Sequence, residues 1–424
     1  MQLTPLPPLH PPSPHRAWHS TPHPTLPLLS TSLGKTARIT SLRSSTPHSV
    51  LEGGHTRSIR STAWKPHLPS QELGLVTGSF DGTAGVWRRD ENAGDEDGER
   101  EEGEDWEFSV VLEGHDAEVK SLAFSPSGQY LATCSRDKSI WIWEEVDGAD
   151  EWETVAVLTE HEGDVKCVAW APTTEGDEGE CLASSSYDGT VRVWREDGEG
   201  EWGCIGVLEG GEETVWGVAW EGASGPSSAS NPDAEADADS KQEVEAEADA
   251  QKPKPRRLIT CSADTTLRVW KRIEAAEAES GGIPSTMRAA AQGEKWVVEA
   301  VLPKAHTRAV YAVAWSERTG RVVSCGGDSR IVVYGEVEGV ADGVVGEGEG
   351  KKEAGEGEKV EGKKEGEGEK VGPGNWKILA TAEMGHGPYE INHVTWCQRF
   401  DGKEGEMVVS SGDDGAVRAW EVTE

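Results

Sequence analysis

The chain has 424 residues, including 51 glycines and 18 tryptophans, and its formal net charge is −36. This acidic balance disfavours a nucleic-acid partner, because binding to phosphates relies on Lys and Arg. No apolar run approaches the roughly 18 residues of a membrane-spanning helix, so no membrane partner is expected. Its 7 cysteines include no CxxC pair or Cys/His cluster, which indicates a reducing compartment and neither a metal site nor a cofactor.

The N-terminal segment, residues 1–51, contains no Asp or Glu and is rich in Ser, Thr and Pro. It is faintly similar to an organellar transit segment, but its prolines would break the amphipathic helix that such segments need. We instead predict a degenerate first copy of the repeat described below, with Gly34 and Thr40 where the repeat has Asp and Trp. Residues 2–6 are the candidate strand that completes the last copy.

One phrase recurs along the rest of the chain. At residues 184–194 it reads SSSYDGTVRVW, a tight Asp-Gly turn followed by an alternating strand that ends on Trp. Alternation indicates a half-buried strand, and Asp-Gly is a strong hairpin signal. In six copies an Asp lies six residues before the final aromatic residue: Asp81 and Trp87, Asp137 and Trp143, Asp188 and Trp194, Asp264 and Trp270, Asp328 and Tyr334, and Asp414 and Trp420.

A histidine stands upstream of the turn in five of these copies: His55, His115, His161, His306 and His386. Gly211 takes this place in the copy that contains Asp264. The spacing from His to Asp varies because it spans a surface loop, whereas one turn and one strand fix the spacing from Asp to the aromatic residue. We interpret His and Asp as a hydrogen-bonded pair that locks the turn to the strand, and not as acid–base catalysts.

Such a repeat buries its faces only against neighbouring copies, which predicts an all-β, seven-bladed β-propeller. The His, Asp and Trp pattern resembles the WD40 family. We predict a single domain over 1–424 with blades at about 15–45, 50–90, 107–145, 153–196, 202–272, 296–335 and 376–422. Inserts at 90–105, 223–256 and 335–374 have too few apolar side chains to offset their ordering entropy, so we predict that they are disordered.

In the WD40 geometry, two positions of each blade point off the blade at one opening of the ring. The first follows the apolar residue of the inner strand, and the second precedes the turn Asp. The first set is Arg60, Lys120, Lys166, Trp216, Tyr311 and Asn392, and the second is Phe80, Arg136, Tyr187, Ala263, Gly327 and Asp413. Because Arg and large aromatic residues are enriched at binding hot spots, we predict that the cations and larger aromatics of these sets bind partners. The alternative is that they only cover the rim.

Arg136 is the best single candidate, since its rigid donor fork suits a carboxylate and Lys120 and Lys166 flank it. Tyr187 and Trp216 are expected to stack beside a bound segment, with Arg60 and Tyr311 as further contacts. These assignments follow from the position of each residue in the repeat.

Several stretches are similar, in order, to consecutive blades of one family, the WD40 proteins of cytosolic iron–sulfur cluster assembly. They are EGGHTRSIRSTAWKP, TGSFDGTAGVWRR, LEGHDAEVKSLAFSPSG, LATCSRDKSIWIWE, VLTEHEGDVKCVAW, LASSSYDGTVRVW and EETVWGVAW. The resemblance covers nearly all of residues 15–422 outside the inserts. It implies a non-catalytic cytoplasmic scaffold, leaves a nuclear location open, and matches the functional arginine of the family to Arg136.

The resemblance also implies the partners. They are the adaptor and the HEAT-repeat subunit of the cytosolic iron–sulfur assembly (CIA) targeting complex, a hydrogenase-like iron–sulfur carrier, and client apoproteins. Another interaction protein, a ubiquitin-ligase substrate receptor or a chromatin scaffold, is the alternative. A propeller enzyme is disfavoured, because the sequence has no Gx4GK[ST], GxSxG or HExxH motif and no converging titratable groups with a metal or nucleophile.

Overall fold

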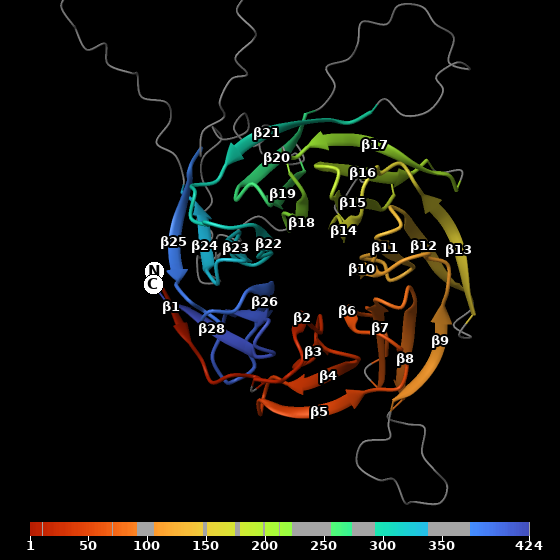
Figure 1. Ribbon diagram of the computed structural model, residues 1–424, viewed down its shortest axis with the longest axis horizontal. Helices are drawn as coiled ribbons and strands as arrows, with labels where there is room; N and C mark the ends of the chain where they lie inside the picture. The colour runs from red at the N-terminus through yellow and green to blue at the C-terminus, as the bar shows by residue number, and fades with distance from the viewer. Residues whose placement is uncertain are drawn as a thin grey trace, which may run out of the picture.

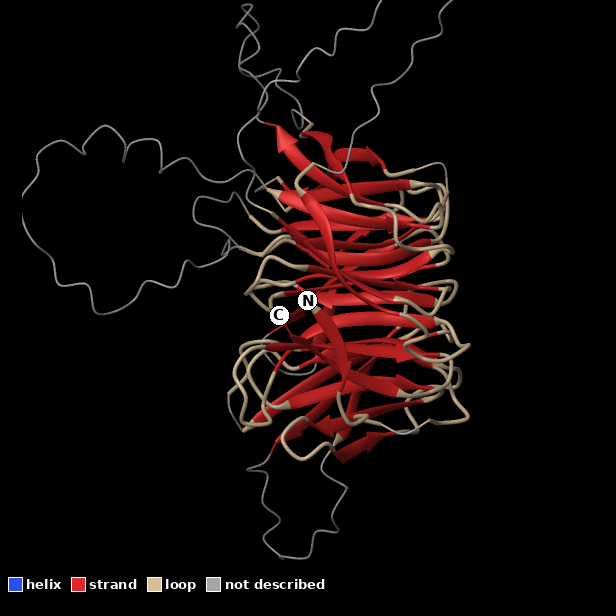
Figure 2. Ribbon diagram, turned by 90° about the vertical axis from the view of Figure 1, so that its left-hand side faces the viewer, coloured by secondary structure: helices blue, strands red, loops and turns tan. Residues whose placement is uncertain are grey.

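The structure is a computed structural model that describes residues 1–10, 12–69, 71–90, 106–146, 151–173, 179–197, 200–211, 213–222, 256–273, 293–337 and 374–423. Within these residues, 28 strands form seven four-stranded antiparallel sheets around a central axis (Figure 1). From the side, the sheets form a thick disc with turns on both flat faces (Figure 2). No helix that could cross a membrane is found in the described part of the chain.

The sheets are numbered as blades in chain order. Blade 1 consists of β2 (Ala17–Pro22), β3 (Leu28–Leu33), β4 (Thr36–Ser41) and β5 (Thr46–Leu51). Blade 2 consists of β6 (Ile59–Trp64), β7 (Glu72–Ser79), β8 (Ala84–Asp90) and β9 (Glu107–Leu112). Blade 3 consists of β10 (Val119–Phe124), β11 (Tyr130–Ser135), β12 (Ile140–Val146) and β13 (Glu151–Leu158). Blade 4 consists of β14 (Val165–Trp170), β15 (Cys181–Ser186), β16 (Thr190–Glu196) and β17 (Trp202–Glu209).

The remaining blades follow the same plan. Blade 5 consists of β18 (Val215–Trp220), β19 (Arg257–Ser262), β20 (Leu267–Ile273) and β21 (Lys295–Val301). Blade 6 consists of β22 (Val310–Trp315), β23 (Val322–Gly326), β24 (Ile331–Glu336) and β25 (Trp376–Ala382). Blade 7 consists of β26 (Ile391–Gln398), β27 (Glu406–Gly412), β28 (Val417–Thr423) and, as its outer strand, β1 (Gln2–Pro5). In every blade the first strand lies next to the axis (Figure 1).

The hydrophobic core is divided among the spaces between neighbouring blades. The second strand of a blade is packed on both faces, so β15, with the sequence CLASSS, is buried at every position. Small Ala, Ser and Cys side chains let the adjacent sheets approach closely there. One such core joins Ile140 and Ile142 of blade 3 to Val165 and Trp194 of blade 4. No blade therefore has a core of its own, as the repeat pattern predicts.

Tryptophans at the ends of the inner strands tie adjacent blades together. The indole N–H of Trp170 donates a 2.9 Å hydrogen bond to the Ala123 carbonyl of blade 3, and Trp220 repeats this with Ala169 of blade 4. Trp64 and Trp396 bond to the preceding blade in the same way, at 2.9 and 3.2 Å. Much of the high tryptophan content thus serves contacts between blades, in addition to the Trp at the end of each repeat phrase.

The ring is closed by the strand expected at residues 2–6. β1 pairs antiparallel with β28, with Leu3 opposite Val422 and Pro5 opposite Trp420. Pro5 fits there because β1 is an outer strand and its last residue needs no further ladder partner. Leu3 is 8% exposed and packs into the core between blades 6 and 7. The two ends of the chain consequently lie side by side (Figures 1 and 2).

The sheets are offset by one strand from the predicted repeats. The repeat predicted at 50–90 begins with β5, which is the outer strand of blade 1, whereas the sheet of blade 2 runs from β6 to β9. The cause is that the outer strands of blades 1 to 6 lead directly into the loop that carries the His position of the next repeat. Blade 1 has four strands, with Gly34 in its β3–β4 turn at φ +58°. Apart from residues at their ends, the predicted inserts 90–105, 223–256 and 335–374 lie outside the described residues.

We expect the β1 contact to contribute strongly to stability. Replacing Leu3 with Ala should lower the free energy of unfolding by about 2–5 kcal/mol, the usual cost of a buried Leu-to-Ala change. Thr4 is exposed on the same strand, and Thr4→Ala should change the free energy of unfolding by no more than about 0.5 kcal/mol. Urea unfolding measures both variants, and an equal loss in the two would contradict closure through Leu3.

Candidate functional site

A chain of four side chains fixes the turn on one flat face of blades 2, 3, 4 and 7, as blade 3 illustrates. His115 Nδ1 lies 2.8 Å from Asp137 Oδ2, and its Nε2 lies 2.9 Å from Thr133 Oγ1. The indole N–H of Trp143 donates to the same Thr133 oxygen at 2.9 Å. Because a carboxylate only accepts, Nδ1 donates its N–H to Asp137, and in the tautomer with the proton on Nδ1 the Nε2 atom accepts the Thr133 hydroxyl. The turn is therefore tied through the blade to the third strand.

The hydrogen bond expected between His and Asp is present in all five copies that have both residues. The hydroxyl at the centre of the network was missed by the sequence analysis. It belongs to Thr77, Thr133, Ser184, Ser324 and Ser410. A spacing would have revealed it, since the hydroxyl residue stands ten positions before the Trp to which it is bonded.

Blade 5 replaces the missing histidine with an arginine. Arg268 Nη2 lies 3.0 Å from Asp264 Oδ2, and Nη1 donates to the Gly210 carbonyl. A Cβ placed on Gly211 would lie 2.9 Å from both Arg268 Nη1 and Asp264 Oδ2, so the guanidinium occupies the space that a histidine fills elsewhere. The loop is held to the turn by a charged side chain from β20. The missing His is visible in the sequence, but the role of Arg268 was not predicted from it.

These networks lower the pKa of the turn carboxylates. Burial alone would raise the pKa of Asp81, but the hydroxyl of Thr83, the backbone N–H of Thr56 and the nearby His55 together lower it from 3.8 to about 2. The pKa of Asp137 is lowered in the same way against its burial, chiefly by His115 and Ser139. The carboxylates stay ionised at neutral pH, and each turn is rigid. Phe80, Arg136 and Tyr187, which directly precede three of these Asp residues, are thereby fixed in place.

The first set of predicted rim residues lines one cavity. Arg60, Lys120, Lys166, Trp216, Tyr311 and Asn392 come from six inner strands and meet at the central channel. Arg136 and Tyr187 do not line this cavity. They lie on the surrounding turns, where 60% of the Arg136 side chain and 64% of Tyr187 are exposed. The structure thus divides the predicted site into a channel cluster and an outer, solvent-facing pair.

Each cation of the channel cluster lies over an aromatic ring of a neighbouring blade. Lys120 Nζ lies 4.7 Å from the ring centre of Phe80, and Lys166 Nζ lies 5.1 Å from that of Trp216. Arg60 lies over Trp18 of blade 1 at 4.8 Å, a ring that the sequence analysis did not include. Each ring offers its negative face to a cation, an interaction of about 0.5–2 kcal/mol. The contact between Lys120 and Phe80 thus joins a residue of the first predicted set to one of the second.

Carboxylates also line the rim, and the sequence analysis did not anticipate them. Glu118 lies 3.5 Å from Arg136, and Asp164 lies 3.1 Å from Lys166. Glu390 accepts a 3.1 Å hydrogen bond from the Tyr311 hydroxyl, and this burial and charge raise the pKa of Tyr311 to about 12. Glu118, Asp164 and Glu390 each stand two residues before a position of the first set, so the repeat contained the signal. The long, exposed pair between Glu118 and Arg136 leaves that guanidinium open to a stronger acceptor.

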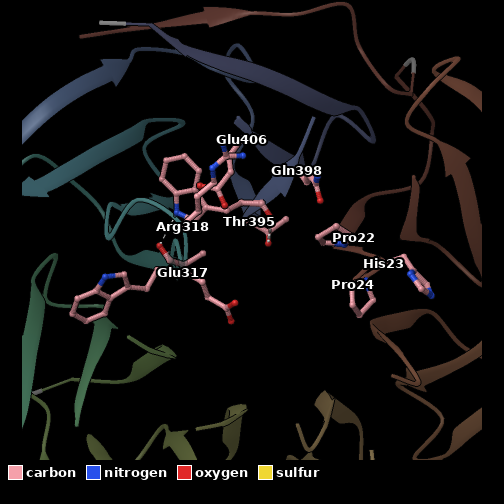
Figure 3. A pocket seen from close by; sticks show the side chains of 11 residues that line it. Pro22, His23, Pro24, Glu317, Arg318, Thr395, Gln398 and Glu406 are labelled. Atoms are coloured by element: carbon pink, nitrogen blue, oxygen red, sulfur yellow. Dashed lines mark hydrogen bonds between the residues drawn. The ribbon is translucent and has the colours of Figure 1, made fainter. Parts of the chain in front are cut away.

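A second cavity lies at the opposite end of the channel. Its lining comes from the far ends of the inner strands, with Pro22 and Pro24 facing Thr395 and Gln398 across the opening (Figure 3). Glu406 accepts a 2.5 Å hydrogen bond from Ser316, and burial raises the pKa of this carboxyl. This end is bordered by carboxylates and one arginine, Arg318, and differs in charge from the cation-rich end.

Groups suited to metal binding are not gathered anywhere in the described ranges of the chain, where no cluster of three or more His, Cys, Asp or Glu residues could hold an ion. The seven cysteines are free. Burial raises the pKa of Cys134, Cys261 and Cys325, so these thiols stay protonated and pack as small apolar groups.

Comparison with known proteins identifies both the repeat and a set of relatives that share nearly the whole chain. A family model described as "WD domain, G-beta repeat" matches residues 45–88, 106–144, 152–195 and 298–335. The chain is 45% identical over 461 residues to a "Probable cytosolic iron-sulfur protein assembly protein 1" of Pyricularia oryzae, covering 97% of this chain and 94% of the relative. It is 46% identical over 479 residues to a protein of the same name from Chaetomium globosum, covering 99% and 95%.

The arginine of blade 5 offers a direct test of the hydrogen-bond networks. Arg268→Ala removes a partner of Asp264 that no histidine replaces, and should cost about 1.5–3 kcal/mol of unfolding free energy. Arg418 contacts Asp414 at 2.8 Å in the equivalent position of blade 7, but His386 holds this carboxylate as well. Arg418→Ala is the matched control, expected to cost less than about 1 kcal/mol. Chemical unfolding measures the unfolding free energy of both variants. Equal losses in the two would contradict the role of Arg268 in place of the missing histidine.

The lowered pKa of Asp81 predicts an acid-sensitive blade 2. Because the folded pKa lies below 3.8, the ionised carboxylate stabilises the fold above that pH, and this contribution is lost as the pH falls toward about 2. Burial also lowers the pKa of His55 below 6.5, so this buried histidine likewise destabilises the fold as the pH falls below 6.5. Asp81→Asn should reduce stability at pH 7 and flatten the dependence between about pH 5 and pH 2. Thermal unfolding at stepped pH measures this, with exposed Asp116→Asn as the control. A slope unchanged by Asp81→Asn would refute the role of Asp81.

Proposed function

The chain belongs to the WD40 family of cytosolic iron–sulfur protein assembly protein 1, and from this premise we propose that it is a scaffold for iron–sulfur protein assembly. Its relatives are named for a cytosolic process, which supports a cytoplasmic location for this chain. A nuclear pool is a further proposal. The fold suits the role, because a closed ring of blades presents rigid surfaces on two flat faces and around its edge.

We propose that the scaffold binds the adaptor and the HEAT-repeat subunit of the CIA targeting complex, together with a hydrogenase-like cluster carrier and client apoproteins. Holding carrier and client at once raises the effective concentration of one at the other, so transfer is favoured without any bond chemistry by the propeller. The histidines support a non-catalytic role, since five of them are engaged at both ring nitrogens by an Asp and a hydroxyl residue.

The observation that carries the client site is the position of Arg136. Its side chain is 60% exposed, and its turn is fixed by the Asp137–His115 network. An exposed cation on the turn of one blade, with exposed Tyr187 on the corresponding turn of the next blade, suits a client segment that ends in, or contains, carboxylates. Trp216 and Tyr311 lie deeper and pack edge to face at 5.1 Å, where they support the opening from the channel side.

Purification of the tagged full-length chain from cytosol tests the function. Recovery of a hydrogenase-like iron–sulfur carrier and a HEAT-repeat subunit is the expected result. Recovery of a ubiquitin-ligase adaptor or of histones in their place would overturn the assignment. Stoichiometric iron or zinc in the purified protein would contradict a scaffold without a cofactor.

Reversing the charge of Arg136 tests the client site separately. Arg136→Glu should weaken client capture by about tenfold or more, because a hot-spot cation is replaced by a charge that repels carboxylates. The melting temperature should not change, since the exposed ion pair with Glu118 contributes little. Lys138→Glu makes the same charge change in the same turn and should leave capture intact. Equal capture by wild type and Arg136→Glu would remove Arg136 from the site.

A further inference from the structure

The cavity at the cation-rich end of the channel has an unusual lining for a protein of net charge −36. Three cations from three adjacent blades line it: Arg60 of blade 2, Lys120 of blade 3 and Lys166 of blade 4. No Asp or Glu is among the residues that form its wall in the described chain. Asp164, which pairs with Lys166, lies outside the wall. The interior of the cavity is therefore positive although the protein as a whole is strongly acidic.

Neutral donors add to these charges. The Ser61 side chain lines the cavity, is 1% exposed and has a hydroxyl without a hydrogen-bond partner. The indole N–H of Trp216, also in the wall, is buried and unpaired. An unsatisfied buried donor costs about 1–3 kcal/mol, so two in one wall indicate a missing acceptor.

Two histidines of the wall contribute donors as well. His19 Nδ1 accepts the backbone N–H of Thr62 at 3.4 Å, and His393 Nδ1 accepts that of Ser20 at 3.5 Å. A backbone N–H can only donate, so in each neutral ring the proton lies on Nε2. The rings are 4.0 Å apart, and burial lowers the pKa of both, to about 3 for His393. Both rings are uncharged at neutral pH and offer an N–H from Nε2.

Of the wall cations in the described chain, Lys166 forms an ion pair with Asp164, whereas Arg60 and Lys120 lie over aromatic rings and form no ion pair. Burial lowers the pKa of Lys120, and the positive charges of Lys166 and Arg60 lower it further, against the opposing effects of Glu118 and Asp164. Burial lowers the pKa of Arg60 to about 10. Within the described residues, the Arg60 guanidinium donates one hydrogen bond, at 3.2 Å to the Trp18 carbonyl. The remaining guanidinium donors and the Lys120 ammonium can serve a further acceptor.

We propose that this cavity binds a small multivalent oxyanion of the phosphate class, held by Arg60, Lys120 and Lys166. An oxyanion is an acceptor on every side and so matches a wall of donors. A phosphate carries about 1.5 to 2 negative charges near pH 7, which suits Arg60 and Lys120 together, whereas a single carboxylate would leave one of these two cations uncompensated. The bound ion would join blades 2, 3 and 4 at their inner strands. Arg136 does not line this cavity, and the site goes beyond the proposed client surface.

Titration of the full-length protein with inorganic phosphate tests the site. Calorimetry in chloride buffer of constant ionic strength should show saturable binding, and the melting temperature should rise with phosphate. Acetate at the same ionic strength should bind at least tenfold more weakly, because its single charge leaves the cluster uncompensated. Absence of phosphate binding, or equal binding of acetate, would overturn the proposal.

Variants locate the binding. Lys120→Met should weaken phosphate binding by about tenfold or more, the loss expected for a hydrogen bond to a charged group. Arg318→Met removes a cation from the cavity at the opposite end of the channel and should leave the affinity unchanged. Loss of affinity in both variants would indicate nonspecific charge attraction and refute the site. If Lys120→Met fails to fold, Lys166→Met with the same control answers the question.

The source of the phosphate group is distinguished by a second ligand. O-phosphoserine presents the same group on a side chain, as a phosphorylated partner would. Binding of inorganic phosphate alone supports a free ion, and equal binding of both supports a group carried by another molecule. Neither result depends on client capture, so the phosphate site and the proposed scaffold function can fail independently.

Discussion

Closure of the ring is the constraint on which the rest of the structure depends. Each core lies between two blades, so an open row of sheets would expose the inner faces of its first and last members. The pairing of β1 with β28 prevents this by joining the ends of the chain within one sheet. A short strand with a proline at its end is sufficient, because the outer position demands hydrogen bonds on only one side.

Rigidity of the functional face follows from the same repeat. Within a blade, the network from Asp137 through His115 and Thr133 to Trp143 connects a surface turn to the third strand. Between blades, the indoles of the inner strands bond to the preceding blade. The turn that presents Arg136 is thus supported from within its blade, and blade 3 is tied to blade 4 by the indole of Trp170. Binding a partner there costs little ordering of the scaffold.

Much of the fold and part of the site could be predicted because the repeat fixes them. A spacing of six residues from Asp to the aromatic position identifies a turn and a strand, and six copies imply a ring. The His–Asp bond could be predicted because a His recurs upstream of the turn Asp in five copies, although the spacing between the two residues varies. Arg268 could not be found this way, since its role depends on the space that Gly211 leaves in three dimensions. The depth of Arg60, Lys120 and Lys166 in the channel likewise depends on how neighbouring blades tilt toward the axis.

The distribution of charge explains why an acidic protein keeps a basic cavity. Rim carboxylates such as Glu118, Asp164 and Glu390 surround the opening, so a large anionic surface meets repulsion before it reaches the channel. A small anion passes this ring and meets only donors inside, and a protein segment with one exposed carboxylate can reach Arg136 on the turn above. Acidic surroundings thus select against nucleic acid, while the local cations remain available to ligands of limited size.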